Sequence, residues 1–267
     1  MPFFLPKLPI SGTNCYSLTQ VRDSRLSERR CFSMPEHLAW VREVAFPHLN
    51  TSLGRGRNSN DLREIQYVKD VLDSSFKIKD LGTLRYFLGL EITRSKSGFH
   101  LNQRKYTLNL LEDTGCLGGK VVQTPFEPFV KLQLEQGQPF FDVFYYRRLV
   151  GRLLYLTISR PDISYVIQQL SVYMSKPMDS HYKEALRVVH YLKNSPAQGL
   201  FFSANSSLTL SAFSDSDWAC CLDTMKSLTG FCVFLGSYLI YWKTKKQNTV
   251  SRSSSEAEYR ALGSLAC

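Results

Sequence analysis

The sequence lacks the cysteine spacing that two common ways of stabilising a fold require. The 267 residues include seven cysteines, an odd number, with no C-x-x-C pair. No histidine stands at the spacing of a zinc finger. We therefore expect neither a disulfide framework nor a structural zinc site, and we expect reduced thiols in an intracellular compartment.

Long hydrophobic runs are also missing. The N-terminal stretch MPFFLPKLPI is apolar, but it is short and is broken by three prolines. No run reaches the roughly 20 apolar residues that a membrane helix needs. We predict no secretion signal, no membrane partner, and a cytoplasmic or nuclear location.

Acidic residues are outnumbered by basic ones. Lys and Arg together number 33 against 23 Asp and Glu, which gives a formal charge of +10 and a pI near 9.3. This excess favours a polyanionic partner, nucleic acid first, because each cation near a phosphate releases a condensed counterion. The plain alternative is that the charge only keeps the protein soluble.

The pattern along the chain predicts three parts. Residues 1–59 lack steady periodicity and end in SLGRGRNSN, so we predict that they are poorly ordered. Residues 60–199 open with an amphipathic helix in NDLREIQYVKDVLDSSF, whose apolar residues recur at helical spacing. Residues 200–267 are β-rich and close with a serine-capped helix in SSSEAEYRALGSLA.

Within the middle part, strands precede helices. FKIKD, RYFLGLEITRSK and GFHLNQ read as strands, the last two joined by a Ser-Gly turn, with Phe87, Leu90 and Ile92 expected to point inward. Four helical stretches follow: QRKYTLNLLEDTGC, Phe144–Ile158, Pro161–Met174 and His181–Lys193. Together with the C-terminal strands and helix, this order predicts an α+β fold.

Carboxylates gather in two places in the last part. Asp215 and Asp217 lie on the predicted strand LTLSAFSDS, and Glu256 and Glu258 lie in the first turns of the final helix. Magnesium binds a few carboxylates together with water and substrate phosphate, so an acid on a strand and another on a helix could hold it. The alternative is that the aspartates close a strand and the glutamates favour a helix N-terminus.

Several long stretches resemble the Pol polyprotein of copia-type LTR retrotransposons. FSDSDWACCLDTMKSLTGFCVFLGSYLIYWKTKKQNTVSRSSSEAEYRAL is similar to the ribonuclease H domain of that family. DLREIQYVKDVLDSSFKIKDLGTLRYFLGLEI, LNQRKYTLNLLEDTG, TPFEP, YRRLVGRLLYLTISRPDISYVIQQLSVYMSKP and ALRVVHYLKNSPAQGL resemble the later part of its reverse transcriptase. The resemblance covers residues 60 to 267 in one order, whereas residues 1–59 do not match.

The resemblance implies a partial reverse-transcriptase palm and thumb-like region followed by a truncated ribonuclease-H-like domain. It implies magnesium held by Asp215, on what we take to be the central strand, and by Glu258, with Glu256 as the alternate ligand and Asp217 as a neighbour. EYRAL fits the family's helix pattern better than EAEYR does. The family also uses a further aspartate on a later strand, and no such strand follows Glu258 in this sequence.

The polymerase half departs from the family in its acids. The family places a Tyr-x-Asp-Asp hairpin just before the first helix, and PHLNTSLGRGRNS stands there without a carboxylate. Tyr67–Asp70, YVKD, reads as helix interior instead. SRPDIS, a family signature, reads physically as a helix start with proline in the first turn. We therefore expect no polymerisation and, with a metal ligand missing, no ribonuclease activity.

Basic side chains are the remaining candidates. The resemblance implies that the helices grip a template–primer duplex, or an RNA–DNA hybrid, through phosphates, whereas a solvated helix face would carry the same residues. WKTKKQ, expected at a sheet edge, would contact the hybrid backbone or protect the edge. The candidates are Arg147, Arg148, Arg152, Lys183, Arg187, Lys193, Lys243, Lys245 and Lys246. A non-catalytic nucleic-acid-binding protein is the alternative function.

Overall fold

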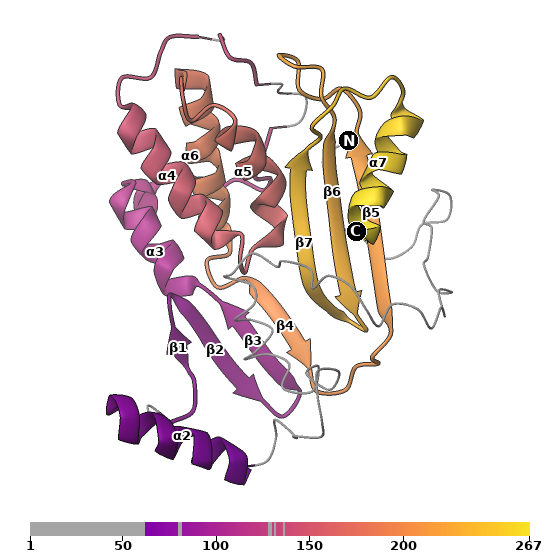
Figure 1. The fold of residues 1–267 in the computed structure, drawn as a ribbon. Coiled ribbons are helices and arrows are strands. Elements are labelled where there is room, and N and C mark those ends of the chain that lie inside the picture. The colour runs from indigo at the N-terminus through magenta and orange to yellow at the C-terminus, as the bar shows by residue number, and fades with distance from the viewer. Residues whose placement is uncertain (1–61, 80–81, 128–129, 131, 136) are drawn as a thin grey trace. The chain divides into compact units, whose positions relative to one another are not determined.

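The computed structural model describes residues 62–79, 82–127, 130, 132–135 and 137–267 (Figure 1). Residues 1–59, predicted to be poorly ordered, lie outside the described residues. The described residues fall in two compact units, one that ends at Leu84 and one from Arg85 to Cys267. Each unit is described by itself.

The first unit contains helix α2 (Leu62–Phe76), which confirms the helix predicted from apolar spacing. The prediction of a strand at FKIKD is wrong for the residues that the structure describes there. Phe76 ends helix α2, and residues 77–79 form no strand. Lys77 has a φ of 49°, in the left-handed region, which is incompatible with an extended strand.

The second unit begins with a four-stranded antiparallel sheet. Its strands β1 (Tyr86–Phe87), β2 (Leu90–Ser95), β3 (Gly98–Asn102) and β4 (Gly199–Ser203) are hydrogen-bonded in this order. The predicted hairpin between β2 and β3 is confirmed. A Cβ atom on Gly98 would lie 2.0 Å from the carbonyl oxygen of Phe202, so the close approach of β4 requires glycine there.

The single strand predicted over RYFLGLEITRSK is interrupted. Leu88 and Gly89 have φ values of 48° and 79° and form the turn between β1 and β2. Phe87 on β1 is 38% exposed, so its predicted inward position is wrong, whereas Leu90 and Ile92 are buried as predicted. The short strand β1 lies at the edge of the sheet, and both of its residues are exposed.

The predicted helices between the two groups of strands are confirmed. They are α3 (Arg104–Asp113), α4 (Val143–Leu156), α5 (Ser164–Ser171) and α6 (Asp179–Asn194), with 3₁₀ turns at Cys116–Gly118 and Pro161–Ile163. Asp142 begins α4 by accepting a hydrogen bond from the backbone N–H of Tyr145 at 2.8 Å. Apolar side chains from these helices form one core, which is stabilised by removing their surface from water.

A buried ion pair explains the SRPD stretch more fully than a helix start does. Arg160 is 1% exposed, and its guanidinium donates to both oxygens of Asp162, at 3.0 and 2.8 Å for the shorter bonds. The hydroxyl of Tyr191 on α6 donates to the same carboxylate at 2.7 Å, and Arg160 also reaches the carbonyl oxygen of Ser195 at 2.9 Å. The network ties the turn before α5 to the end of α6.

A second antiparallel sheet and a helix complete the unit. Strands β5 (Leu210–Asp217), β6 (Leu228–Leu235) and β7 (Tyr238–Lys246) pair in this order, and α7 (Ser254–Ala266) packs mainly on β5 and less on β6 (Figure 1). On the opposite side α5 contacts β7, and Trp242 donates to the carbonyl oxygen of Thr157 at 3.1 Å. Helices combined with antiparallel sheets confirm the α+β class.

The predicted division of the chain at residues 199 and 200 stays a prediction. By hydrogen bonding, β4 belongs to the first sheet, and the rings of Phe99 on β3 and Phe202 on β4 stack with centroids 4.6 Å apart. β4 also contacts β7, where the ring of Phe202 lies 5.8 Å from that of Tyr238. The strand therefore joins the two sheets.

Candidate functional site

The two aspartates of the second sheet lie on an edge strand. Asp215 and Asp217 are two residues apart on β5, so their side chains leave the same face. In the described part of the chain β5 pairs with β6 alone, so the central strand of this sheet is β6. The expectation that Asp215 lies on the central strand is therefore wrong.

Asp215 and Glu258 meet at the free edge of β5. The backbone N–H of Ser216 donates to Oδ1 of Asp215 at 2.9 Å and to Oε1 of Glu258, on α7, at 3.3 Å. Burial, with the nearby Asp215 carboxylate as the next cause, raises the pKa of Glu258 above its ordinary value. Two carboxylates that share one donor and repel each other form a local negative site.

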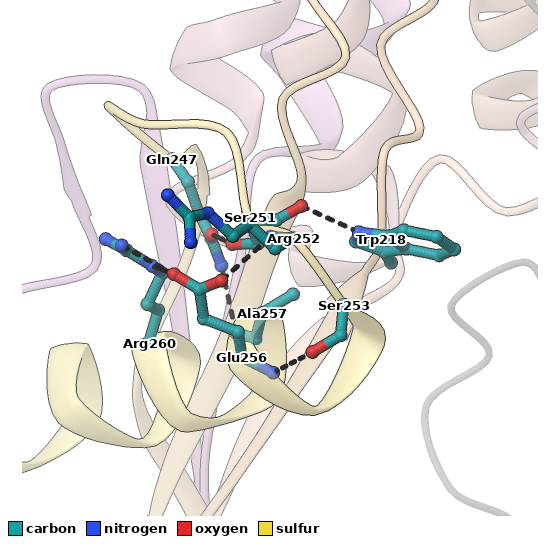
Figure 2. A network of polar contacts seen from close by, with 8 residues as sticks. All are labelled: Trp218, Gln247, Ser251, Arg252, Ser253, Glu256, Ala257 and Arg260. Atoms are coloured by element: carbon teal, nitrogen blue, oxygen red, sulfur yellow. Dashed lines mark hydrogen bonds and ion pairs between the residues drawn. The ribbon is translucent and has the colours of Figure 1, made fainter.

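Glu256 lies away from this pair. Its carboxylate accepts the backbone N–H of Arg252 at 2.8 Å and two guanidinium bonds from Arg260 at 3.0 and 2.8 Å (Figure 2). The Arg252 N–H and then the Arg260 guanidinium lower the pKa of Glu256. Ser253 begins α7 by accepting the N–H of Glu256 at 3.2 Å. The structure thus brings Glu258, and not Glu256, to Asp215.

Asp217 faces the helical part of the unit. Burial raises its pKa, a hydrogen bond with Tyr165 of α5 opposes that rise, and Asp215 adds to it. Asp217 in turn contributes, after burial, to a raised pKa at Cys220. Asp217 is therefore half-buried against α5, and it is a neighbour of the Asp215 and Glu258 pair rather than a third member of it.

Gln247 positions the strand and the helix that carry the acids, and sequence reasoning missed it. Its amide nitrogen lies 3.2 Å from Oγ of Ser216, 3.0 Å from Oγ1 of Thr229 and 3.0 Å from the carbonyl oxygen of Ala257. Its oxygen accepts from Ser251 at 2.9 Å, and the carbonyl of Ser251 accepts from Trp218 at 3.0 Å (Figure 2). A single glutamine after a lysine-rich strand gives no signal of this role.

Five of the nine predicted basic residues form polar contacts within the chain. Arg147 donates to the carbonyl oxygen of Met174 at 2.7 Å, and Arg152 pairs with Asp113 at 2.5 Å. The remaining committed side chains are Arg187 with Glu127 at 3.5 Å, Lys193 with the carbonyl of Gly119 at 2.6 Å, and Lys246 with the sulfur of Cys221 at 3.8 Å.

Other basic residues are exposed. Arg148 and Lys183 lie on the solvent side of α4 and α6, and Lys243 and Lys245 lie on β7. Lys243 and Lys245 share a face of β7 with Tyr241, and Phe231 on β6 lies opposite Lys243. α7 packs on β5 and β6. Within the described residues Lys243 and Lys245 are exposed, and Tyr241 is half-buried. β7 is a sheet edge, as predicted.

Two further observations limit the site. The described residues contain no group of three or more His, Cys, Asp or Glu side chains arranged to hold a metal ion. Among those same residues, no helix combines the length and the apolar character needed to cross a membrane.

Comparison with known proteins identifies the family of this chain. Residues 57–128 match the family described as reverse transcriptase (RNA-dependent DNA polymerase). The chain is 43% identical over 203 residues to the retrovirus-related Pol polyprotein from transposon RE2 of Arabidopsis thaliana, a match that covers 76% of this chain and 14% of the polyprotein. No solved structure matches the chain.

Two further relatives, one shorter and one less similar, also match most of the chain. An uncharacterized mitochondrial protein of Arabidopsis thaliana, AtMg00810, is 43% identical over 191 residues, which cover 72% of this chain and 79% of that protein. The Pol polyprotein from transposon TNT 1-94 of Nicotiana tabacum is 30% identical over 208 residues, 74% of this chain and 15% of the polyprotein. The chain belongs to the family of retrovirus-related Pol polyproteins from transposons and contains a part of the reverse-transcriptase region. It spans about one seventh of the length of the Pol polyproteins that it matches.

Proposed function

We propose that β5, β6, β7 and α7 are the beginning of a ribonuclease-H-like domain, in which Asp215 and Glu258 hold magnesium. The observation that carries this proposal is the single Ser216 N–H shared by both carboxylates, at 2.9 and 3.3 Å. Carboxylate oxygens are the ligands that magnesium prefers, and a cation there would relieve the repulsion that contributes to the raised pKa of Glu258. Bound magnesium would stabilise charge on the attacking water and the leaving oxygen of a phosphodiester.

Within the Pol polyprotein, the substrate of such a domain is the RNA strand of an RNA–DNA hybrid. The part of this chain that the structure describes brings two carboxylates together, and Asp217 lies toward α5 instead. Two cations that clamp a phosphodiester need more acidic ligands than this pair. We therefore propose that the chain by itself binds magnesium weakly and cleaves no hybrid.

We also expect no polymerisation by the chain. Polymerases use the same two-metal chemistry with paired aspartates in the palm. The residues before α2, PHLNTSLGRGRNS, contain no aspartate or glutamate. The reverse-transcriptase part would then contribute its helices to binding rather than to chemistry.

A magnesium titration followed by thermal unfolding tests the acid pair. Magnesium is expected to raise the Tm of the wild-type chain and of Glu256→Gln, whose carboxylate is held by Arg260. Asp215→Asn and Glu258→Gln should lose this response. An equal magnesium response in all four proteins contradicts the site, and magnesium-dependent cutting of a hybrid that requires Asp215 contradicts the proposed inactivity.

The second candidate function is non-catalytic binding of duplex nucleic acid. The observation that favours it is the pair of exposed lysines, Lys243 and Lys245, on the same face of β7 as the half-buried Tyr241. Lysines beside an aromatic ring suit a sugar–phosphate backbone, and binding of this kind weakens steeply with salt. The double variant Lys243→Ala/Lys245→Ala should lower the salt dependence of hybrid binding, whereas an unchanged salt slope would exclude this pair.

A further inference from the structure

A turn after β5 carries two adjacent cysteines, Cys220 and Cys221. The carbonyl oxygen of Cys221 accepts from the backbone N–H groups of Thr224 and Met225 at 3.3 and 2.7 Å. Residues 223–225 are exposed to solvent, whereas Cys221 is 6% exposed. Cys221 therefore lies directly beneath an exposed turn, so a small solute needs only a movement of this turn to reach its sulfur.

The sulfur atoms of the two cysteines have partners on different elements. Sγ of Cys220 lies 4.0 Å from Nε2 of Gln169 on α5. Sγ of Cys221 lies 3.8 Å from Nζ of Lys246, the last residue of β7, and accepts from the hydroxyl of Thr224 at 3.1 Å. The sulfur of Cys221 is thus in contact with an amine, whereas that of Cys220 lies beside an amide.

The surroundings of Cys220 suppress its reactivity. Burial, with the Asp217 carboxylate as the next cause, raises the pKa of the Cys220 thiol to about 11. The thiolate is the nucleophilic form of cysteine, so Cys220 is almost wholly unreactive near neutral pH. Oxidation of this pair should therefore start at Cys221, where a cationic side chain touches the sulfur.

We propose that Cys221 and Lys246 are a modification site, at which a peroxide produces a covalent sulfenamide bond between Sγ and Nζ. The two atoms already lie 3.8 Å apart, on segments that are 25 residues apart in the sequence (246 − 221 = 25). The ligand class is therefore a small oxidant, and hydrogen peroxide is its simplest member. The second reactant belongs to the chain itself.

The reaction has two steps. The Cys221 sulfur, after its proton leaves to solvent, attacks one oxygen of hydrogen peroxide, and the O–O bond breaks to give a sulfenic acid and, with one proton, water. The Lys246 ammonium loses a proton to solvent, and its nitrogen then attacks the sulfur. The S–O bond breaks, and the oxygen leaves as water with a proton from the nitrogen. In sum, a thiol, an ammonium and hydrogen peroxide give a sulfenamide, two waters and one proton.

The bond would fasten the turn to the end of β7. Lys246 directly precedes Gln247, whose amide nitrogen contacts Ser216 on β5 and Ala257 on α7. A cross-link at Lys246 would therefore fix the segment that holds this strand and this helix together. It uses neither carboxylate of the acid pair, so its failure would leave the magnesium and nucleic-acid proposals untouched.

The experiment treats the full chain with hydrogen peroxide, blocks the remaining thiols with iodoacetamide, and identifies tryptic peptides by mass spectrometry. Trypsin should release residues 194–226 joined to residues 246–252, because a modified Lys246 is no longer cut. Loss of two hydrogens should place the linked pair about 2 Da below the summed peptide masses. Dithiothreitol should restore the separate peptides, because a thiol reduces the sulfur–nitrogen bond.

Lys246→Arg is the decisive variant. It keeps a positive charge beside Cys221, but a guanidinium stays protonated and cannot attack the sulfur. The linked peptide should disappear, and the sulfenic acid at Cys221 should be trapped by dimedone. The matched control is Lys245→Arg, which makes the same change one residue away, on the opposite face of β7, and should keep the link. Cys220→Ser should keep it as well.

Three results would overturn the proposal. The first is a linked peptide in Lys246→Arg, and the second is a disulfide between Cys220 and Cys221 in place of the link. The third is an unmodified Cys221 in a wild-type sample in which the exposed Cys267 is oxidised, because that cysteine reports that the peroxide was active. This last comparison needs no variant, so it does not depend on how a substitution affects folding.

Discussion

The two glutamates of α7 predict opposite effects of the same substitution. Burial and Asp215 raise the pKa of Glu258, whereas Arg252 and Arg260 lower the pKa of Glu256. Replacing Glu258 by Gln removes a carboxylate that the fold disfavours, so Glu258→Gln should stabilise the chain at neutral pH. Replacing Glu256 removes one that the fold favours, so Glu256→Gln should destabilise it.

The two effects also have defined pH windows. A raised folded pKa gives a cost that is absent well below the ordinary value of 4.5 and grows as the pH rises through that value. The gain from Glu258→Gln should therefore vanish near about pH 3 and reach a plateau above the raised pKa. A lowered pKa behaves oppositely, so the contribution of Glu256 is present above 4.5 and is lost as the pH falls through its folded pKa.

The size of the Glu258 effect follows from its exposure. Glu258 is only partly buried and most of its side chain is exposed to solvent on α7, so screening by water limits the unfavourable free energy to about 0.5 kcal/mol, the range of other exposed charge pairs. Urea unfolding from pH 3 to 8, with the m-value held in common, measures both variants. A loss of stability in Glu258→Gln at neutral pH, or a gain that does not depend on pH, would refute the reasoning.

Two further predictions concern buried groups in the helical core. Asp162→Ala leaves the buried Arg160 guanidinium, whose side chain is 2% exposed, without its carboxylate partner. This substitution should lower the free energy of unfolding in urea by about 3–5 kcal/mol, whereas Asp113→Ala, which removes an exposed ion pair, should lower it by less than about 1 kcal/mol. A loss for Asp162→Ala near that of Asp113→Ala would contradict a stabilising role of the buried network. His181, which accepts the Met178 N–H at Nδ1 and whose Nε2 lies 2.9 Å from the Gln133 carbonyl oxygen, has its pKa lowered by burial. Its contribution is full above pH 6.5 and falls as the pH drops through that value toward the folded pKa; unfolding measured between pH 7 and 5 should show this decline in the wild-type chain and a smaller one in His181→Gln.

Local patterns predicted most of the elements of this fold. Helical spacing of apolar residues located α2, α4 and α6, because one face of each of these segments is apolar whatever its neighbours are. The secondary-structure predictions failed where the backbone conformation of a single residue ends or interrupts an element. The left-handed backbone at Lys77 and at Leu88 ended a helix and interrupted a strand, and neither residue type announces such a conformation.

Pairing between distant segments was less predictable. β4 joins β3 across about a hundred residues, and no turn signal marks that partnership. The same limit applies to β5, which was expected at the centre of its sheet and lies at its edge among the described residues. Periodicity shows which face of a strand is apolar, but the order of strands depends on contacts that no local pattern contains.

The buried face of α7 bears on the choice between Glu256 and Glu258 as the acid near Asp215. Ala257 and Ala261 are the buried residues of α7 and define the face that packs on the sheet. At 3.6 residues per turn, Glu258 lies about 80° from the centre of that face on one side and Glu256 about 120° on the other. The alanine spacing in the sequence therefore already favours Glu258 as the acid closer to the sheet. Only the direction in which α7 crosses β5 decides that this flank meets Asp215, because the reverse crossing would place the Glu256 flank at the free edge.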